Sequence, residues 1–161
     1  VQMQHLHQFV DNVDPYIEKG NPASGLLWGI SDAALAPTGS GDNMVQAYNY
    51  RICLTSDKEN MLPIEKPANY DASRYELLLR IIEAQKLYAL NNYFIISPMP
   101  NNKTDINNRG AFSTDMIGMN HDYPEASYER RAEIIQAHKD YTLGLLWFMG
   151  NDERVPKQLR D

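Results

Sequence analysis

The sequence of 161 residues contains a single cysteine, Cys53. One cysteine excludes a disulfide within the chain and a zinc site built from cysteines alone. Long apolar runs are missing as well, because the best candidate, LGLLWFMG at 143–150, is far shorter than the roughly 20 residues that cross a bilayer. We therefore expect no membrane span.

Clusters of lysine and arginine are also absent. The net charge is −6 and the isoelectric point is near 5.2, whereas nucleic-acid-binding proteins usually present a basic face. No nucleic-acid partner is therefore expected. The hydrophobic content of 43% and the charged content of 22% are typical of a globular domain. We predict a single domain over residues 1–161.

Three motifs of phosphate and metal chemistry do not occur: G-x-G-x-x-G, G-x-x-x-x-G-K-[ST] and H-E-x-x-H. The stretch GSGD, at 39–42, has no strand pattern before it and no helix pattern after it, so we interpret it as a turn. His5 and His7 would share one face of a strand, but no third ligand accompanies them. We therefore expect no metal site.

The spacing of apolar residues predicts short strands. Residues 44–55, MVQAYNYRICLT, alternate between two faces and are rich in β-branched and aromatic side chains. The run YFIIS, at 93–97, indicates a buried strand, and VQMQH, at 1–5, indicates a further short one.

A helix is predicted from the apolar spacing that follows residue 73. Ser73 and Glu76 form a possible capping box, and Asp71 is a competing cap. One face of this helix should be buried, and the helix should end near Asn91.

A second long helix is predicted between Asp122, which can cap it, and Gly150 or Asn151. Asp152 with Pro156 indicates the start of a third, short helix. The sequence therefore predicts an α+β fold, in which two long helices pack on a small, mostly antiparallel sheet with long ordered loops.

Two residues with reactive side chains have simple structural interpretations. Cys53 lies among apolar neighbours in a predicted strand, so a buried, inert thiol is expected. His138 lies beside Lys139 and Asp140 in a predicted helix, so we expect it on a solvated helix face and not in a catalytic site.

Arg51 interrupts a strand that otherwise suits a core. A buried arginine requires a partner, which is either a carboxylate of the protein or an anionic ligand. Both alternatives are open at the level of sequence.

The stretch KTDINNRGAFSTDMIGMNHDYPEAS, at 103–127, is polar and rich in asparagine. It brings Lys103, Asp105, Asn107 and Asn108 close together in sequence and adds Asn120 further on. Asparagine and aspartate tolerate turn backbones, so an ordered structural loop is one interpretation. The other is that these groups line a polar pocket in which the lysine stabilises an anion.

A lyase is a further alternative. A polysaccharide lyase needs a group that neutralises a uronate carboxylate and another that removes the adjacent proton, and Asn120, His121 and Tyr123 have suitable side chains. Three neighbours in sequence rarely converge on one substrate, however, and Asp122 between them is a candidate helix cap.

Four sequence blocks together resemble a bacterial family of FAD-dependent oxidoreductases, some members of which carry the label xanthan lyase. The blocks are GDNMVQAYNYRICLT, KPANYDASRYELLLR, KTDINNRGAFSTDMIGMNHDYPEASYERR and LLWFMGNDERVPKQLR. The resemblance runs from about Gly25 to the C-terminus. It implies a substrate-side or cap segment whose partner is an FAD-binding domain of the same polypeptide. It leaves the compartment open, export included.

The resemblance also implies roles for the polar residues. FAD would carry the electron transfer, and this chain would position a small-molecule or carbohydrate substrate. Because the glycine fingerprint is missing, flavin binding by this chain alone is not expected. Lys103 would stabilise negative charge on the reduced flavin or the substrate, and Asp105 would orient the lysine or act as a base. Substrate or cofactor would be bound by Arg51, Asn107, Asn108 and Asn120. The alternative is a non-catalytic carbohydrate-binding or interaction domain.

Overall fold

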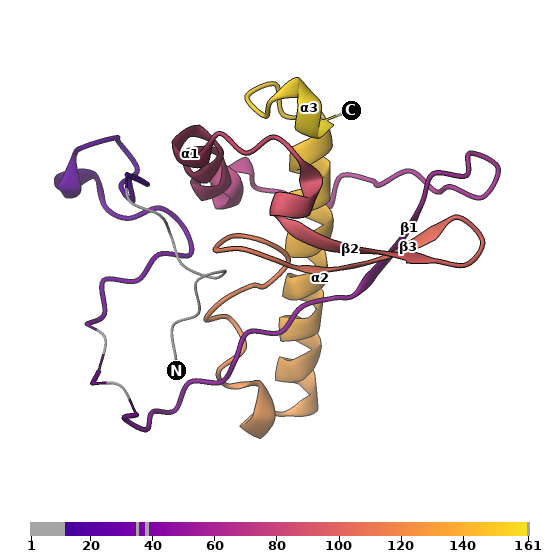
Figure 1. The fold of residues 1–161 in the computed structure, drawn as a ribbon. Coiled ribbons are helices and arrows are strands. Elements are labelled where there is room, and N and C mark those ends of the chain that lie inside the picture. The colour runs from indigo at the N-terminus through magenta and orange to yellow at the C-terminus, as the bar shows by residue number, and fades with distance from the viewer. Residues whose placement is uncertain (1–11, 35, 38, 161) are drawn as a thin grey trace.

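The computed structural model describes residues 12–34, 36–37 and 39–160 (Figure 1). Its strands are β1 (Ile52–Thr55), β2 (Phe94–Met99) and β3 (Lys103–Asn108), and its α-helices are α1 (Glu76–Gln85), α2 (Tyr128–Asn151) and α3 (Lys157–Arg160). Short 3₁₀ helices are η2 (Pro22–Ser24), η3 (Ala72–Tyr75), η4 (Leu90–Asn92) and η5 (Tyr123–Glu125). The strand predicted at 1–5 lies outside the described residues.

The three strands form one antiparallel sheet in the order β1-β3-β2. Asp105, in the central strand, lies opposite Cys53 on one side and Ser97 on the other. Two long helices accompany this sheet, and the described chain before β1 is extended and loop-like (Figure 1). The α+β prediction is therefore confirmed.

The polar stretch that begins at residue 103 is not a loop over its first six residues, because 103–108 is the central strand β3. The interpretation of this part as a loop is wrong for a physical reason. Ile106 is its only apolar residue and is 3% exposed, so the usual alternation of apolar side chains is absent. Asn101 and Asn102, both with positive φ, make the turn from β2. Pairing with β1 on one side and β2 on the other therefore forms this strand, although its sequence lacks the alternation typical of strands.

The first helix is shorter than predicted. The carboxylate of Asp71 accepts a hydrogen bond from the Ser73 backbone N–H at 2.9 Å and so caps η3, which leads into α1. Helix α1 ends at Gln85, because Lys86 adopts a left-handed backbone with φ 54°. The predicted end near Asn91 is therefore wrong. The residue that ends the helix is Lys86 and not a glycine, the usual sequence signal for a helix end.

The second helix is capped by a different residue from the one predicted. The Ser127 hydroxyl accepts from the Arg130 backbone N–H at 3.3 Å, whereas Asp122 makes no capping bond and pairs with the Arg130 side chain at 2.8 Å. Helix α2 ends at Asn151, as predicted, and α3 follows it. None of the helices in the described part combines the length and hydrophobicity that a bilayer crossing requires.

The core joins both long helices to the inner face of the sheet. The buried cluster includes Phe94 and Ile106 from the sheet together with side chains of α1 and α2. At its centre the Tyr75 hydroxyl donates to the Tyr141 carbonyl oxygen at 2.9 Å. Gly144 lies against this hydroxyl so closely that a Cβ atom there would overlap it. This contact fixes how closely the η3–α1 segment approaches α2.

The outer face of the sheet is open to solvent. Residues 44–51 are not strand, so β1 is shorter than predicted. Cys53 is exposed, which contradicts the expected buried thiol, and Ile95 is 46% exposed although its strand was expected to be buried. None of the helices that the structure describes covers this face (Figure 1), and its side chains are available for function.

Candidate functional site

A row of polar side chains follows the outer face of β3. Lys103, Asp105 and Asn107 alternate with inward residues, so they share one face and are all partly buried. At about 3.4 Å per residue the row extends over roughly 14 Å. Of the six residues expected to form the site, three make up this row, Arg51 contacts it and Asn108 follows it directly in sequence.

The first contact is an ion pair between Arg51 and Asp105. The Arg51 Nε donates to Asp105 Oδ1 at 3.1 Å, and its second nitrogen, Nη2, pairs with Oδ2, which makes a fork-like contact. Of the two open alternatives for Arg51, the structure provides a protein carboxylate. The expected burial is wrong, because the Arg51 side chain is 56% exposed. An exposed pair of this kind contributes about 0–1 kcal/mol to stability, so its main effect is to orient Asp105.

The second contact is a network of amides at the end of β3. The Asn49 Nδ2 group donates to Asn107 Oδ1 at 2.9 Å and to Asn108 Oδ1 at 3.0 Å. Asn108 Nδ2 in turn donates to Asp115 Oδ2 at 2.7 Å. Asn107 and Asn108 are therefore oriented by the protein itself. Sequence reasoning missed Asn49, because nothing in its local pattern shows that it reaches β3.

Asn120 is separate from this row. It is fully buried, its Nδ2 group donates to the Gln46 carbonyl oxygen at 2.8 Å, and its Oδ1 has no partner among the described residues. His121 Nδ1 accepts from the Val45 backbone N–H at 3.1 Å. Both side chains hold the 45–46 segment. The trio that suggested a lyase is thus engaged in structural contacts, since Tyr123 packs edge-on against Tyr48 instead.

Two clefts flank the polar row. Lys103 lines the first, with a volume of about 440 Å³, and Asn49 lines the second, with a volume of about 340 Å³. The first is completed by Cys53, Leu54, Thr55, Asn60, Met61, Leu62, Pro63 and Ile64, and the second by Tyr48, Tyr50, Tyr123, Ile134, Ile135 and His138. The Lys103 ammonium has no ion pair or side-chain hydrogen bond with any residue that the structure describes. It is therefore the cation of the row that is free to meet an anion.

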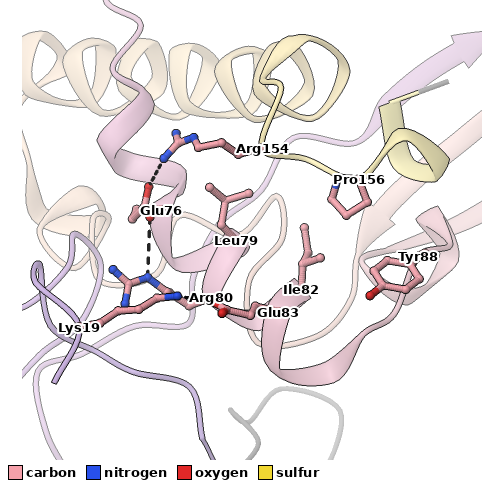
Figure 2. A pocket seen from close by; sticks show the side chains of 9 residues that line it. All are labelled: Lys19, Glu76, Leu79, Arg80, Ile82, Glu83, Tyr88, Arg154 and Pro156. Carbon is pink, nitrogen blue, oxygen red and sulfur yellow. Dashed lines mark hydrogen bonds and ion pairs between the residues drawn. The ribbon is translucent and has the colours of Figure 1, made fainter.

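A third cleft, of about 350 Å³, lies beside α1 and is shown in Figure 2. Arg80 is 7% exposed there, and its Nη2 donates to the Ile17 carbonyl oxygen at 3.3 Å. Its other nitrogens lie 3.6 Å from Asp14 Oδ1 and 3.7 Å from Glu76 Oε1. The pKa of Asp14 is lowered, first by the hydrogen bond from the Tyr16 backbone N–H. Sequence reasoning missed Arg80, although its spacing of four residues from Glu76 on the apolar face was a usable signal.

The other cations of this third cleft also have carboxylate partners. Arg154 Nη1 lies 2.7 Å from Glu76 Oε2, and Lys19 Nζ lies 2.5 Å from Glu83 Oε2 (Figure 2). The pKa of Arg154 is raised, chiefly by its hydrogen bond with Asp152 and further by the one with Glu76. The charges of this cleft are balanced by the protein, so it is a structural network and a poor anion site.

The described residues do not fit the pyrophosphate of a dinucleotide. Such a cradle needs a strand, a glycine-rich turn and a helix N-terminus, whereas the sheet here is antiparallel. The first turns of α1 and α2 carry Glu76 and Glu129, which repel phosphate. The GSGD stretch leads into no helix. No group of three metal-ligating side chains occurs in the described residues, and His5 and His7 lie outside them.

Comparison with known proteins adds one finding. The family model described as FAD dependent oxidoreductase matches residues 2–158, which is nearly the whole chain. No curated protein and no solved structure matches the chain significantly.

Proposed function

The chain belongs to the FAD dependent oxidoreductase family, and from this premise we propose that it forms the substrate-side part of such an enzyme. The flavin would be held by polypeptide outside these 161 residues. Two observations support this division. The chain has no glycine fingerprint and the described residues have no dinucleotide cradle. The open face of the sheet presents an ordered row of polar groups between two clefts.

The polar row is the observation that carries the proposal. Lys103, whose ammonium has no side-chain partner among the described residues, would bind an anionic group of the substrate. Asn107 would donate a hydrogen bond through its Nδ2 group, since its oxygen already accepts from Asn49. Arg51 holds both oxygens of Asp105, so this carboxylate would act as an oriented acceptor and not as a partner of Lys103. Asn108 would support Asn107 from the same network.

The flavin content of the purified protein tests whether the flavin is held by polypeptide outside these 161 residues. The intact protein should purify with the absorption spectrum of oxidised flavin, whereas residues 1–161 alone should leave the fluorescence of added FAD unchanged. A colourless intact protein that takes up no flavin would contradict the proposal. Tight FAD binding by the 161 residues alone would contradict it equally, because the cradle would then lie within this chain.

Substitution of Lys103 tests the polar row. In the intact protein, with a screened substrate and an artificial electron acceptor, Lys103→Ala should lower kcat/KM by about tenfold to a hundredfold, since a charge-assisted hydrogen bond contributes about 1.5–3 kcal/mol. The matched control is Lys139→Ala, which removes an exposed lysine of α2 and should leave kcat/KM unchanged. Equal kcat/KM values for both variants would show that Lys103 of β3 does not contact the substrate.

A further inference from the structure

The cleft beside α2 is lined by a histidine whose ring has a buried nitrogen without a partner in the part of the chain that the structure describes. His138 lines this cleft and is 4% exposed. Its Nδ1 lies 2.8 Å from the Ile134 carbonyl oxygen, one helical turn earlier. A carbonyl oxygen only accepts, so Nδ1 donates, and Nε2 of the neutral ring is the acceptor. This Nε2 has no hydrogen-bond partner among the described residues and is shielded from solvent.

An unpartnered acceptor of this kind is uncommon, because a buried polar atom without a hydrogen bond destabilises the folded protein. A donor brought by a ligand would satisfy it. The expected position of His138 on a solvated helix face is therefore wrong, because the residue is buried. Its burial with an unpartnered nitrogen indicates a possible ligand contact.

The described walls of the cleft are mainly aromatic and aliphatic. Tyr48 and Tyr123 meet edge to face with ring centroids 5.5 Å apart, and the Arg131 guanidinium packs over the Tyr123 ring, also at 5.5 Å. Among the described residues, no lysine, arginine, aspartate or glutamate lines the cleft. Tyr48 is 42% exposed, so its side chain has room to turn aside for a ligand. The lining therefore favours a neutral, flat, largely apolar molecule.

We propose that this cleft binds a small phenol, whose O–H donates to His138 Nε2 while its ring packs against the tyrosines. A sugar fits less well, because each of its hydroxyls needs a partner. The Tyr50 hydroxyl is already committed to the Ile135 carbonyl oxygen at 3.3 Å, and the Asn49 Nδ2 group is committed to β3. The inference concerns ligand binding alone and goes beyond the flavin-side function.

The test compares two probes that differ in one hydroxyl. Protein labelled with ¹⁵N-histidine is titrated with 4-methylphenol and with toluene. The phenol should bind roughly five- to tenfold more tightly, the usual effect of one hydrogen bond. Only the phenol should shift the His138 Nε2 resonance upfield. Methyl glucoside should not bind, and its saturable binding in the cleft would favour a sugar site and overturn the proposal.

Variants assign the binding to this cleft. His138→Phe keeps a ring of similar size and should erase the preference for the phenol over toluene. Tyr48→Ala should weaken both probes, whereas Tyr128→Ala, at a residue that is 84% exposed and outside the cleft, should change neither. The proposal fails if the two probes bind equally to the original protein, if neither binds saturably, or if Tyr48→Ala leaves both affinities unchanged. The comparison of Tyr48→Ala with the original protein tests the proposal even if His138→Phe does not fold.

Discussion

At the scale of single residues, Gly144 shows how closely the core is packed. It lies in the middle of α2, where glycine is otherwise unfavourable by about 1 kcal/mol relative to alanine. The Tyr75 hydroxyl occupies the space of the missing side chain and is held there by its hydrogen bond to the Tyr141 carbonyl oxygen. The close approach of the tyrosine therefore explains a glycine that helix propensity alone would disfavour.

Gly144→Ala should lower the free energy of unfolding by about 1–3 kcal/mol, the usual effect of forcing a methyl group into a filled core. The control is Gly150→Ala in the last turn of the same helix, where an added Cβ meets nothing within 4 Å. That variant should raise the free energy of unfolding by up to about 1 kcal/mol. Urea denaturation of both variants measures the difference, and a shift of the same sign in both would contradict this account of Gly144.

Tyr93 makes a prediction about alkaline pH. It is 3% exposed, its hydroxyl donates to the Leu87 carbonyl oxygen at 2.8 Å, and burial raises its pKa to about 12. The unfolded chain releases this proton near pH 10, at about the ordinary pKa of tyrosine. The folded protein thus binds more protons between about pH 10 and pH 12, so this contribution to stability is complete below about pH 10 and is lost as the pH rises.

The measurement is the free energy of unfolding as a function of pH in this alkaline window. It should fall with pH, and Tyr93→Phe should reduce the slope by up to about 1.4 kcal/mol per pH unit. Tyr75, whose pKa is also raised by burial, should still contribute in the variant. An unchanged slope in Tyr93→Phe would show that this hydroxyl does not keep its proton as burial implies.

At the scale of elements, different interactions determine the secondary structure at the two ends of the 103–127 stretch. Strand β3 is defined by pairing with both neighbours, whereas α2 begins at a local cap, Ser127. Local chemistry of this kind is accessible to sequence analysis, but two caps compete here, and only the structure shows which residue reaches the free N–H groups.

Ser127→Ala should therefore lower the free energy of unfolding by about 1 kcal/mol, the typical effect of losing a cap. Asp122→Ala removes the cap expected from sequence, which in fact makes an exposed ion pair with Arg130, and should cost less than about 0.5 kcal/mol. Chemical denaturation of the two variants ranks them. A larger loss of unfolding free energy for Asp122→Ala than for Ser127→Ala would indicate that Asp122 is the cap.

At the scale of the whole molecule, the segment before η2 is attached to α1 by charge. Arg80 reaches the Asp14 carboxylate and the Ile17 carbonyl oxygen from within α1. The segment itself is closed by backbone hydrogen bonds from Ile17 N–H to Gly25 and from Leu27 N–H to Pro15. One buried side chain therefore supports a loop that has little regular structure of its own.

Arg80→Ala should speed hydrogen exchange of the Ile17 and Leu27 amides by about tenfold or more, because hydrogen bonds to charged groups contribute about 1.5–3 kcal/mol. Lys19→Ala breaks only an exposed pair with Glu83 and should leave these rates nearly unchanged. Exchange of the α2 amides provides the internal reference. Equal rates in both variants would show that the loop is held by packing alone.

Sequence reasoning was most successful where a segment carries its own periodicity. Helix α2 ends where the apolar spacing and the Gly150–Asn151 signal predicted, and the α+β class follows from that spacing. Strand β3 was missed because its polar residues are stabilised by partners distant in sequence, as the Asn49 contact shows. Arg51 was recognised as needing a carboxylate or an anion, but its exposure depends on where β1 begins, which alternation alone does not reveal.

The central position of β3 also limits how this region can change in length. Met99 faces Lys103 across a tight turn, and every later pair of the hairpin follows from that match. One inserted residue within the strand would carry the Asp105 carboxylate into the apolar interior and turn the Ile106 side chain out to water. Two inserted residues would restore each side chain to its original side. Viable length variants of this strand should therefore differ from it by even steps.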